Sequence, residues 1–310
     1  MGHIIRSITL ADEIKGSSRI QFITTSDSDV QELIKARGYR VRHFMNDDSI
    51  IENLSEFRVT TIIIDRPPVT EDIMKRFRQS TNARIILLDS DENASKWADV
   101  AINGLWAKEF KNKKYLDESS KTLHYYGPKY LILREQFNNY ARKSLPNLAN
   151  VRNILLIFGG SDPSNLTTKT LERLLELNEE KLRITVIAGP KFEYHEELRK
   201  VIDRYGAREC VSVVINTEEI AKLMVQNELV FVSPGLAMFE ALSIGLYVIA
   251  SCQNELQRDV YRYFLENNDV IPEPFHFLPN TFFLSPKQKK VQDMQIGRGK
   301  DELIHIILDG

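Results

Sequence analysis

The sequence predicts an α/β fold made of two Rossmann-like domains that face a central cleft. Short apolar runs alternate with amphipathic helical stretches along most of the 310 residues. Near-continuous β-branched runs between helices are typical of a parallel sheet covered on both faces. The alternation fades after residue 103 and begins again at residue 152. We therefore predict an N-terminal domain at residues 1–145 and a C-terminal domain at residues 146–310.

The N-terminal half begins with residues 3–15, where apolar side chains recur at helical spacing. This spacing predicts an amphipathic helix. Strands and helices then alternate, and glycine, proline and polar residues mark the turns. The predicted strands are 20–24, 40–44, 59–65, 84–89 and 99–102, and the predicted helices are 29–36 and 70–79. Two of these strands end in an acid, Asp65 and Asp89.

The C-terminal half repeats the same alternation. The predicted strands are 152–158, 182–188, 211–215, 229–232 and 247–250, and the predicted helices are 166–177, 192–205, 217–225 and 236–243. A glycine-marked turn at residues 297–300 precedes a stretch at 301–308. We expect a final helix there.

Residues 229–257 have the pattern of a strand, a glycine turn, a helix and a second strand. The glycine lies at the carboxyl end of the first strand, the edge where open α/β sheets bind ligands. The amides of Gly235, Leu236 and Ala237 open the helix without intrahelical partners, at the positive end of its dipole. These residues therefore predict an anion site suited to a phosphate.

Glu240 lies one turn into the same helix, and helical side chains lean back toward the amino end. A carboxylate beside a phosphate is repelled unless it accepts hydrogen bonds from hydroxyl groups, which a ribose offers. Phosphate plus ribose is therefore one interpretation of this helix. A glycine-started helix with one solvated glutamate is the other, and a single glycine and glutamate do not separate the two.

A second glycine turn follows the strand predicted at 152–158. Gly160, Asp162 and Asn165 lie in it, and Ser164 or Asn165 is the expected N-cap of the next helix. Backbone approach to a ligand phosphate is one interpretation, and an ordinary strand-to-helix connection is the other. The turn lacks a following Gly-Lys-Ser/Thr, and no predicted strand precedes G-x-G-x-x-G. These absences argue against kinases and dehydrogenases.

Composition excludes several partners. The formal net charge of −2 gives no electrostatic reason to expect nucleic acid or an anionic membrane. No apolar run approaches the roughly 20 residues that span a bilayer, and the first residues do not form a signal peptide. We expect Cys210 and Cys252 to be free thiols of a cytoplasmic protein. The six histidines lack metal-ligand spacing, so we predict no metal and no other cofactor.

Taken in order, these motifs resemble those of the PseG family, the UDP-sugar hydrolases of pseudaminic acid biosynthesis, which have the GT-B fold. Spore coat polysaccharide biosynthesis proteins and the peptidoglycan GlcNAc-transferase are related to that family. The resemblance covers nearly the whole chain. The matching residues are Gly2-His3 with Arg6 and Leu10-Ala11, then Asp65, then Gly127 with Tyr130, Leu133-Arg134 and Phe137, then Gly159-Gly160 with Asp162 and Asn165, then Ser233 with Gly235 and Glu240, and finally Gln257.

The resemblance implies that a UDP-linked diacetamido-trideoxy-hexose is cleaved to UDP and free sugar, with inversion at the anomeric carbon and without a metal. His3 matches the general base that activates water, a role that an imidazole performs well near neutral pH. The turn at Gly235 would hold the diphosphate and Glu240 the ribose. The resemblance also assigns to substrate or UDP binding Gly2, Asp65, Arg134, Gly160, Asp162, Asn165, Leu236, Ala237, Asn254 and Gln257.

The chain departs from the family in three places. The family has a central strand before its opening motif, whereas this sequence begins at that motif, so we expect the N-terminal domain to lack its first strand. Arg66-Pro67-Pro68 replaces an aromatic residue that follows the acid, and Met238 replaces a hydroxyl residue beside the diphosphate. In the GT-B fold the final helix often crosses back to the first domain, which is the expectation for residues 301–308.

The same motifs are compatible with two other functions. A GT-B glycosyltransferase would pass the sugar to a sugar or lipid-linked acceptor instead of water. A non-catalytic paralogue would bind the nucleotide-sugar without turnover. The motifs do not indicate an oligomeric state.

Overall fold

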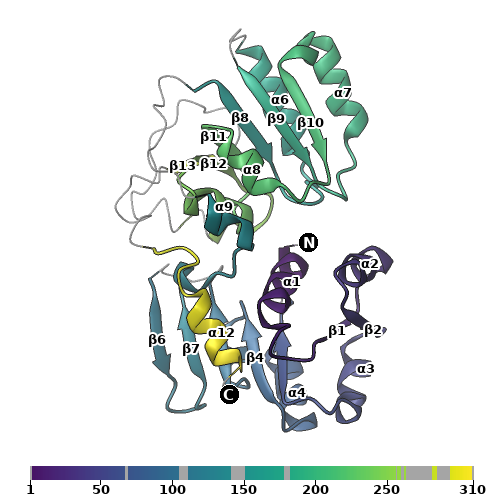
Figure 1. Ribbon diagram of the computed structural model, residues 1–310, viewed down its shortest axis with the longest axis vertical. Coiled ribbons are helices and arrows are strands. Elements are labelled where there is room, and N and C mark those ends of the chain that lie inside the picture. The colour runs from purple at the N-terminus through teal and green to yellow at the C-terminus, as the bar shows by residue number, and fades with distance from the viewer. Residues whose placement is uncertain are drawn as a thin grey trace. The chain divides into compact units, whose positions relative to one another are not determined.

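The computed structural model describes residues 2–66, 69–104, 111–140, 151–177, 182–255, 257–259, 262, 281–284 and 294–308. The chain divides into two compact units, which can be followed in Figure 1. The first unit contains His3–Ile132 and the segment after Ile296, and the second contains Leu133–Ile296. The predicted domain boundary, between residues 145 and 146, lies outside the described residues. Each unit is built on a largely parallel sheet, which confirms the predicted α/β class.

The first unit contains every strand and helix predicted for it, together with short elements that were not predicted. Its elements are α1 (Gly2–Ile14), β1 (Gln21–Thr24), α2 (Ser28–Ala36), β2 (Arg40–His43), α3 (Asp47–Glu52), η1 (Leu54–Glu56), β3 (Thr61–Ile64), α4 (Glu71–Ser80), β4 (Arg84–Leu88), α5 (Glu92–Ser95), β5 (Val100–Asn103), β6 (Lys113–Leu116), β7 (Leu123–Tyr126), η2 (Pro128–Tyr130) and α12 (Lys300–Leu308).

The strands of the first unit form two separate sheets. One has the order β3-β4-β5-β7-β6, parallel except for β6, and the other is the parallel pair β1-β2. Among the described residues no strand joins β1 to β3.

Helix α1 connects the two sheets through its apolar side chains. Ile8 packs in a cluster with Val30 and Ile34 of α2, and residues of β1 and β2 border that cluster. Leu10 and Ile14 instead belong to the cluster that contains residues of β4 and β5. A two-stranded sheet is at best marginally stable in water, so α1 supplies the apolar cover that attaches β1-β2 to the unit.

Helix α12 also belongs to the first unit, although it ends the sequence. Leu303 and Ile307 are buried in the same cluster as strands β4 and β5. Arg84 on β4 donates to the carbonyl of Ile306 over 2.5 Å, and Lys129 pairs with Glu302 over 3.2 Å. The last helix is therefore anchored by both apolar burial and side-chain hydrogen bonds.

The second unit also contains every strand and helix predicted for it. Its elements are η3 (Glu135–Asn139), β8 (Asn153–Ile157), α6 (Leu166–Glu176), β9 (Arg183–Ala188), α7 (His195–Arg204), η5 (Ala207–Glu209), β10 (Val211–Ile215), α8 (Ile220–Val225), β11 (Leu229–Val232), α9 (Leu236–Ser243), β12 (Tyr247–Ser251) and β13 (Thr281–Leu284). The sheet order is β10-β9-β8-β11-β12-β13, parallel except for β13.

This strand order places a topological switch point between β8 and β11. From β8 the chain continues to β9 and β10 on one side, and β11 and β12 then extend the sheet on the other side. Ligands of open α/β sheets bind outside the carboxyl ends of strands at such a point. The turns after β8 and β11 are therefore the part of this unit where a ligand site is expected.

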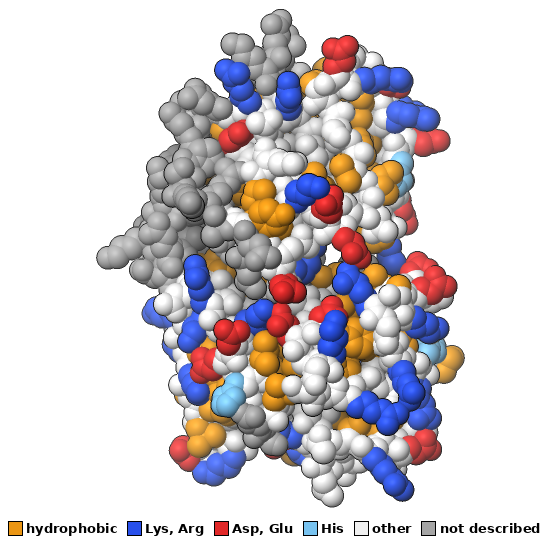
Figure 2. All heavy atoms as spheres, in the orientation of Figure 1, with side chains coloured by type: hydrophobic (Ala, Val, Ile, Leu, Met, Phe, Trp, Pro, Cys, Tyr) orange, Lys and Arg blue, Asp and Glu red, His pale blue; other side chains and the backbone are white. Residues whose placement is uncertain are grey.

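Acidic and basic side chains are interspersed over the face shown in Figure 2, in keeping with the formal net charge of −2. Within the described part of the chain, no helix combines the length and hydropathy that crossing a bilayer requires.

Candidate functional site

His3 and Asp65 form a hydrogen-bonded pair in the first unit. His3 lies in the first turn of α1 and Asp65 follows β3, with His3 Nδ1 2.9 Å from Asp65 Oδ1. His3 Nδ1 also lies 3.1 Å from Arg6 Nη2, which can only donate, so the two neighbours favour opposite tautomers; with the proton on Nδ1 facing the carboxylate, Nε2 is the acceptor nitrogen. The side chain of His3 is 24% exposed and that of Asp65 4%. The pair therefore presents a half-buried base held by a buried carboxylate.

Arg6 and Ser7, also on α1, hold the second oxygen of the Asp65 carboxylate. Arg6 Nε donates to Oδ2 over 3.0 Å and Ser7 Oγ donates over 2.8 Å. Burial by itself would raise the pKa of Asp65, but the hydrogen bond with His3 and the charge of Arg6 outweigh it and lower this pKa to about 2. Asp65 is therefore ionised throughout the neutral range.

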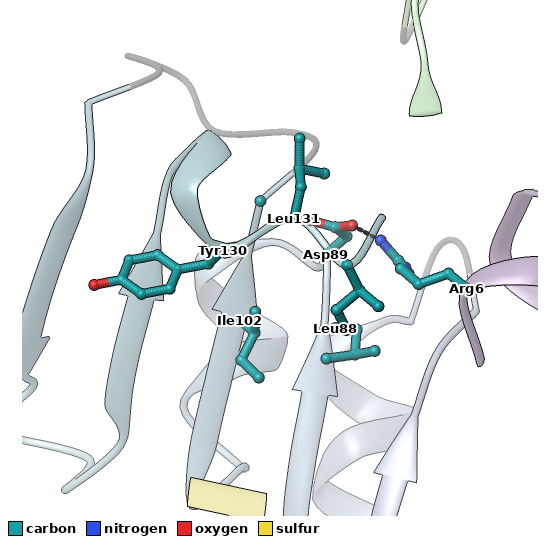
Figure 3. Close-up of a pocket in the computed structure, with 8 residues that line it drawn as sticks. Arg6, Leu88, Asp89, Ile102, Tyr130 and Leu131 are labelled. Carbon is teal, nitrogen blue, oxygen red and sulfur yellow. Dashed lines mark hydrogen bonds and ion pairs between the residues drawn. The ribbon is translucent and has the colours of Figure 1, made fainter. Parts of the chain in front are cut away.

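Arg6 also pairs with Asp89, the acid that directly follows β4 (Figure 3). Burial alone would lower the pKa of Arg6, but the charges of Asp89 and Asp65 raise it. Leu88, Leu131 and other residues line a hollow beside the pair that has no room for even a water molecule. Ligand pockets usually measure about 300–1,000 Å³, so this hollow is too small for a nucleotide-sugar. The Arg6–Asp89 pair therefore holds α1 against β4 instead of lining a pocket.

In the second unit, helix α9 begins at Gly235 without a side-chain cap. The carbonyl of Gly235 accepts the amides of Met238 and Phe239 over 3.1 and 3.3 Å. The backbone of Gly235 is extended, and a Cβ built on it would meet nothing closer than the Ser233 carbonyl at 4.0 Å. Neither backbone strain nor packing therefore requires glycine at this position. The first amides of α9, including those of Leu236 and Ala237, keep the properties of an anion site.

Glu240 is fully buried and meets Arg134. Arg134 Nε donates to Oε1 over 2.8 Å and Nη2 to Oε2 over 2.5 Å. The side chain of Arg134 remains 18% exposed, whereas that of Glu240 is 0% exposed. The solvated glutamate of the alternative interpretation is therefore wrong. The structure brings together two predicted UDP-binding residues, and Arg134 is the one that reaches the surface.

In the turn after β8, Asp162 caps helix α6. Its Oδ1 accepts the amide of Leu166 over 2.9 Å and its Oδ2 that of Thr167 over 2.7 Å. Asn165, one of the two positions predicted from the sequence, is the N-cap residue of α6, but its side chain makes no capping hydrogen bond. Burial raises the pKa of Asp162, and the two capping amides oppose that rise. The buried carboxylate of Asp162 thus fixes the conformation of this turn through its two backbone hydrogen bonds.

Gly160 lies in the same turn and packs closely against the loop that follows β9. A Cβ at Gly189 would come within 2.5 Å of the Gly160 Cα, and the Gly160 carbonyl accepts the amide of Lys191 over 2.9 Å. Gly159 has φ +91°, and a Cβ on it would meet nothing within 4 Å. Gly159 thus faces open space.

Gln253, which was not predicted as a site residue, connects the two turns. Its Nε2 donates to the Phe158 carbonyl over 2.8 Å and to Ser233 Oγ over 2.7 Å. Its Oε1 accepts the amide of Ser164 over 3.4 Å. The polar run after β12 was the signal for this residue, but the sequence could not show that its amide reaches two other strand ends.

The predicted residues Gln257 and Asn254 form a chain of hydrogen bonds that holds the backbone of Gln253. Gln257 Oε1 accepts the backbone amide of Gln253 over 2.6 Å, and Asn254 Oδ1 accepts the backbone amide of Gln257 over 3.0 Å.

Two residues that differ from the PseG motifs can also be placed. Met238 is fully buried, and Arg66 pairs with Asp47. The remaining two residues of that segment, at positions 67 and 68, lie outside the described residues.

Gly2 begins α1, and a Cβ on it would meet nothing within 4 Å. The described residues contain no group of three histidine, cysteine or acidic side chains suited to a metal ion.

No protein-family model matches the chain. It is 37% identical over 311 residues to an uncharacterized protein, MJ1062, of Methanocaldococcus jannaschii, covering 99% of this chain and 63% of that relative, so the chain spans less than two thirds of that protein's length. It is also 25% identical over 280 residues to the spore coat polysaccharide biosynthesis protein SpsG of Bacillus subtilis, covering 87% of this chain and 79% of SpsG.

Solved structures similar to the chain include those of HepE, MurG and a glycosyltransferase. HepE of Anabaena, in complex with UDP and glucose, has a TM-score of 0.52 and 12% identity, covering 100% of this chain and 94% of HepE. MurG of Acinetobacter baumannii has a TM-score of 0.58 and 12% identity, covering 100% and 96%. A glycosyltransferase of Rickettsia africae has a TM-score of 0.53 and 11% identity, covering 99% and 94%. Together with the two parallel-sheet units, these likenesses show that the chain has the GT-B fold.

Proposed function

We propose that the protein is an enzyme that hydrolyses a UDP-linked diacetamido-trideoxy-hexose in nonulosonic acid or surface polysaccharide biosynthesis. The observation that carries the nucleotide part is the uncapped amino end of α9 at the switch point between β8 and β11. A neighbour of the same fold is a complex with UDP. The motif resemblance supplies the sugar and the reaction.

In this proposal the second unit binds UDP. The amides of Gly235, Leu236 and Ala237 face the diphosphate, and the open space at Gly235 lets the phosphate approach the backbone. Arg134 is the more accessible member of its pair with Glu240, so it contacts the nucleotide first. Each Glu240 oxygen keeps acceptor capacity after its bond with Arg134, and it becomes available to a ribose hydroxyl only when Arg134 shifts.

The first unit supplies the base. His3 Nε2 takes a proton from water, and the oxygen attacks the anomeric carbon as the bond to the UDP oxygen breaks. The products are the inverted free sugar and UDP, and the proton on Nε2 then returns to solvent. Asp65 keeps Nδ1 protonated and stabilises the imidazolium that forms, as carboxylates beside catalytic histidines do in serine hydrolases.

A sugar transferase is the second candidate function, and the structural likeness to a glycosyltransferase favours it. The same base would then deprotonate an acceptor hydroxyl instead of water. The third possibility from the sequence, a binder without turnover, keeps the UDP contacts and has no role for the His3–Asp65 pair.

Two measurements test the proposal. Calorimetric titration with UDP should give saturable binding, and no binding would refute the nucleotide site. UDP release from UDP-sugars in water alone should proceed at the full rate without an added acceptor. Release that needs an acceptor would establish transfer, and binding without release in either assay would establish the non-catalytic reading.

A further inference from the structure

The turns after β8 and β11 are neighbours, because the two strands pair in register from Leu229 with Ile154 to Val232 with Ile157. Each turn presents a glycine to open space. A Cβ at Gly159 would meet nothing within 4 Å, and one at Gly235 nothing closer than 4.0 Å. Two adjacent stretches of accessible backbone are an arrangement suited to a ligand with two linked anionic groups.

One side chain joins these turns. The amide of Gln253 reaches Phe158 and Ser164, which flank the first turn, and Ser233, which begins the second. An amide is the side chain that can donate twice and accept once in this way. The main chain of Gln253 is held as well, because its backbone N–H donates to Gln257 Oε1 over 2.6 Å.

We propose that Gln253 is a positioning residue that holds the two turns at the spacing required by a nucleoside diphosphate. Gln253 acts through the turns and does not itself touch the ligand. The inference rests on the proposed UDP site and adds to it a cause for preferring a diphosphate over a monophosphate. A monophosphate engages only one turn, so its affinity depends little on their spacing.

Gln253→Glu is the sharpest variant, because it keeps the shape of the side chain and replaces the donating Nε2 with an oxygen. Gln136→Glu is the matched control. Gln136 also bridges backbone groups of the second unit, donating to the Glu218 carbonyl over 3.0 Å and accepting the Ala221 amide over 2.9 Å, but it does so at α8.

In Gln253→Glu, UDP affinity should fall by about tenfold or more, while UMP affinity should change by less than about threefold. Gln136→Glu should leave both affinities within about threefold of the original. Equal losses of UDP and UMP affinity, or no loss of UDP affinity, would overturn the role of Gln253. If the unsubstituted protein binds no UDP, the proposed function fails instead.

Hydrogen exchange tests the link between the turns without any ligand. The Ser164 amide donates to Gln253 Oε1, so it should exchange faster in Gln253→Ala, which removes that acceptor, and at the original rate in Gln136→Glu. Ser233→Ala is a milder variant that removes one acceptor of Gln253, and it should weaken UDP binding in the original background but not in Gln253→Glu. Unchanged exchange at Ser164, or additive effects of the two substitutions, would contradict the link.

Discussion

Arg134 grips both carboxylate oxygens of Glu240, with Nε 2.8 Å from Oε1 and Nη2 2.5 Å from Oε2. The carboxylate is completely buried, and the guanidinium lies 5.2 Å from the ring centroid of Phe137. A buried charge is tolerated when it is paired and hydrogen-bonded. The pair therefore couples the stability of α9 to the segment that carries Arg134.

Glu240→Gln should lower the free energy of unfolding by about 3 kcal/mol, because it leaves Arg134 partly buried without a counter-charge. Urea denaturation measures this effect. Glu172→Gln on α6 is the control, since Glu172 pairs with Arg204 on the surface over 2.6 Å and should lose less than about 1 kcal/mol. A Glu240→Gln protein that loses UDP affinity at unchanged stability would make Glu240 a ligand contact alone.

Gly235→Ala should weaken UDP binding and leave stability within about 0.5 kcal/mol of the original. The added methyl group enters the open space before the first amides of α9, and the extended backbone accepts alanine. Isothermal titration and thermal unfolding measure the two effects. Gly206→Ala should instead lower stability and leave UDP affinity unchanged. Gly206 has φ +60°, and alanine there is strained by about 1 kcal/mol. Undiminished UDP affinity in Gly235→Ala would remove the phosphate from this turn.

His3→Gln should abolish hydrolysis while UDP affinity stays within about threefold, because His3 is assigned to the chemical step only. Asp65→Asn should reduce kcat by about two to four orders of magnitude, since an asparagine amide facing Nδ1 favours the wrong tautomer. Steady-state kinetics at saturating substrate measures both. Parallel losses of turnover and UDP affinity would mean that His3 has a structural role.

The low pKa of Asp65 makes stability depend on acid pH. Burial opposes ionisation, but His3 and Arg6 outweigh burial and lower the folded-state pKa to about 2, below the ordinary value of 3.8. A depressed carboxyl pKa contributes stability above the unfolded-state value, and the contribution is lost as pH falls from about 4 toward 2. The loss of stability should amount to about 2 kcal/mol. Denaturant unfolding at several pH values across that range measures it.

The titration of Asp117 must be separated from that of Asp65 in this experiment. Hydrogen bonds from Ser119 lower its pKa to about 2 as well, although it is exposed. The pH series is therefore run in an Asp117→Asn background, with Asp65→Asn added for comparison. An identical pH dependence with and without Asp65 would show that this carboxylate makes no contribution.

Much of the secondary structure followed from local pattern. The helix expected at residues 236–243 spans Leu236–Ser243, and the strand expected at 211–215 spans Val211–Ile215. Both are mainly apolar stretches bounded by glycine or polar residues, so the residues themselves carry the signal. Strand β6 was missed, because Lys113–Leu116 is exposed at every position and no alternation of apolar residues marks it.

The sequence by itself determined the α/β class, the two halves and the turns that carry candidate ligand residues, because periodicity and turn chemistry are properties of neighbouring residues. Only the tertiary structure decided what each polar side chain meets. Glu240 is paired with Arg134, which lies 106 positions away. Asp162 caps the helix that follows it, and Gln253 connects the ends of two strands. These partners depend on strand order and burial, and a single stretch of sequence contains neither.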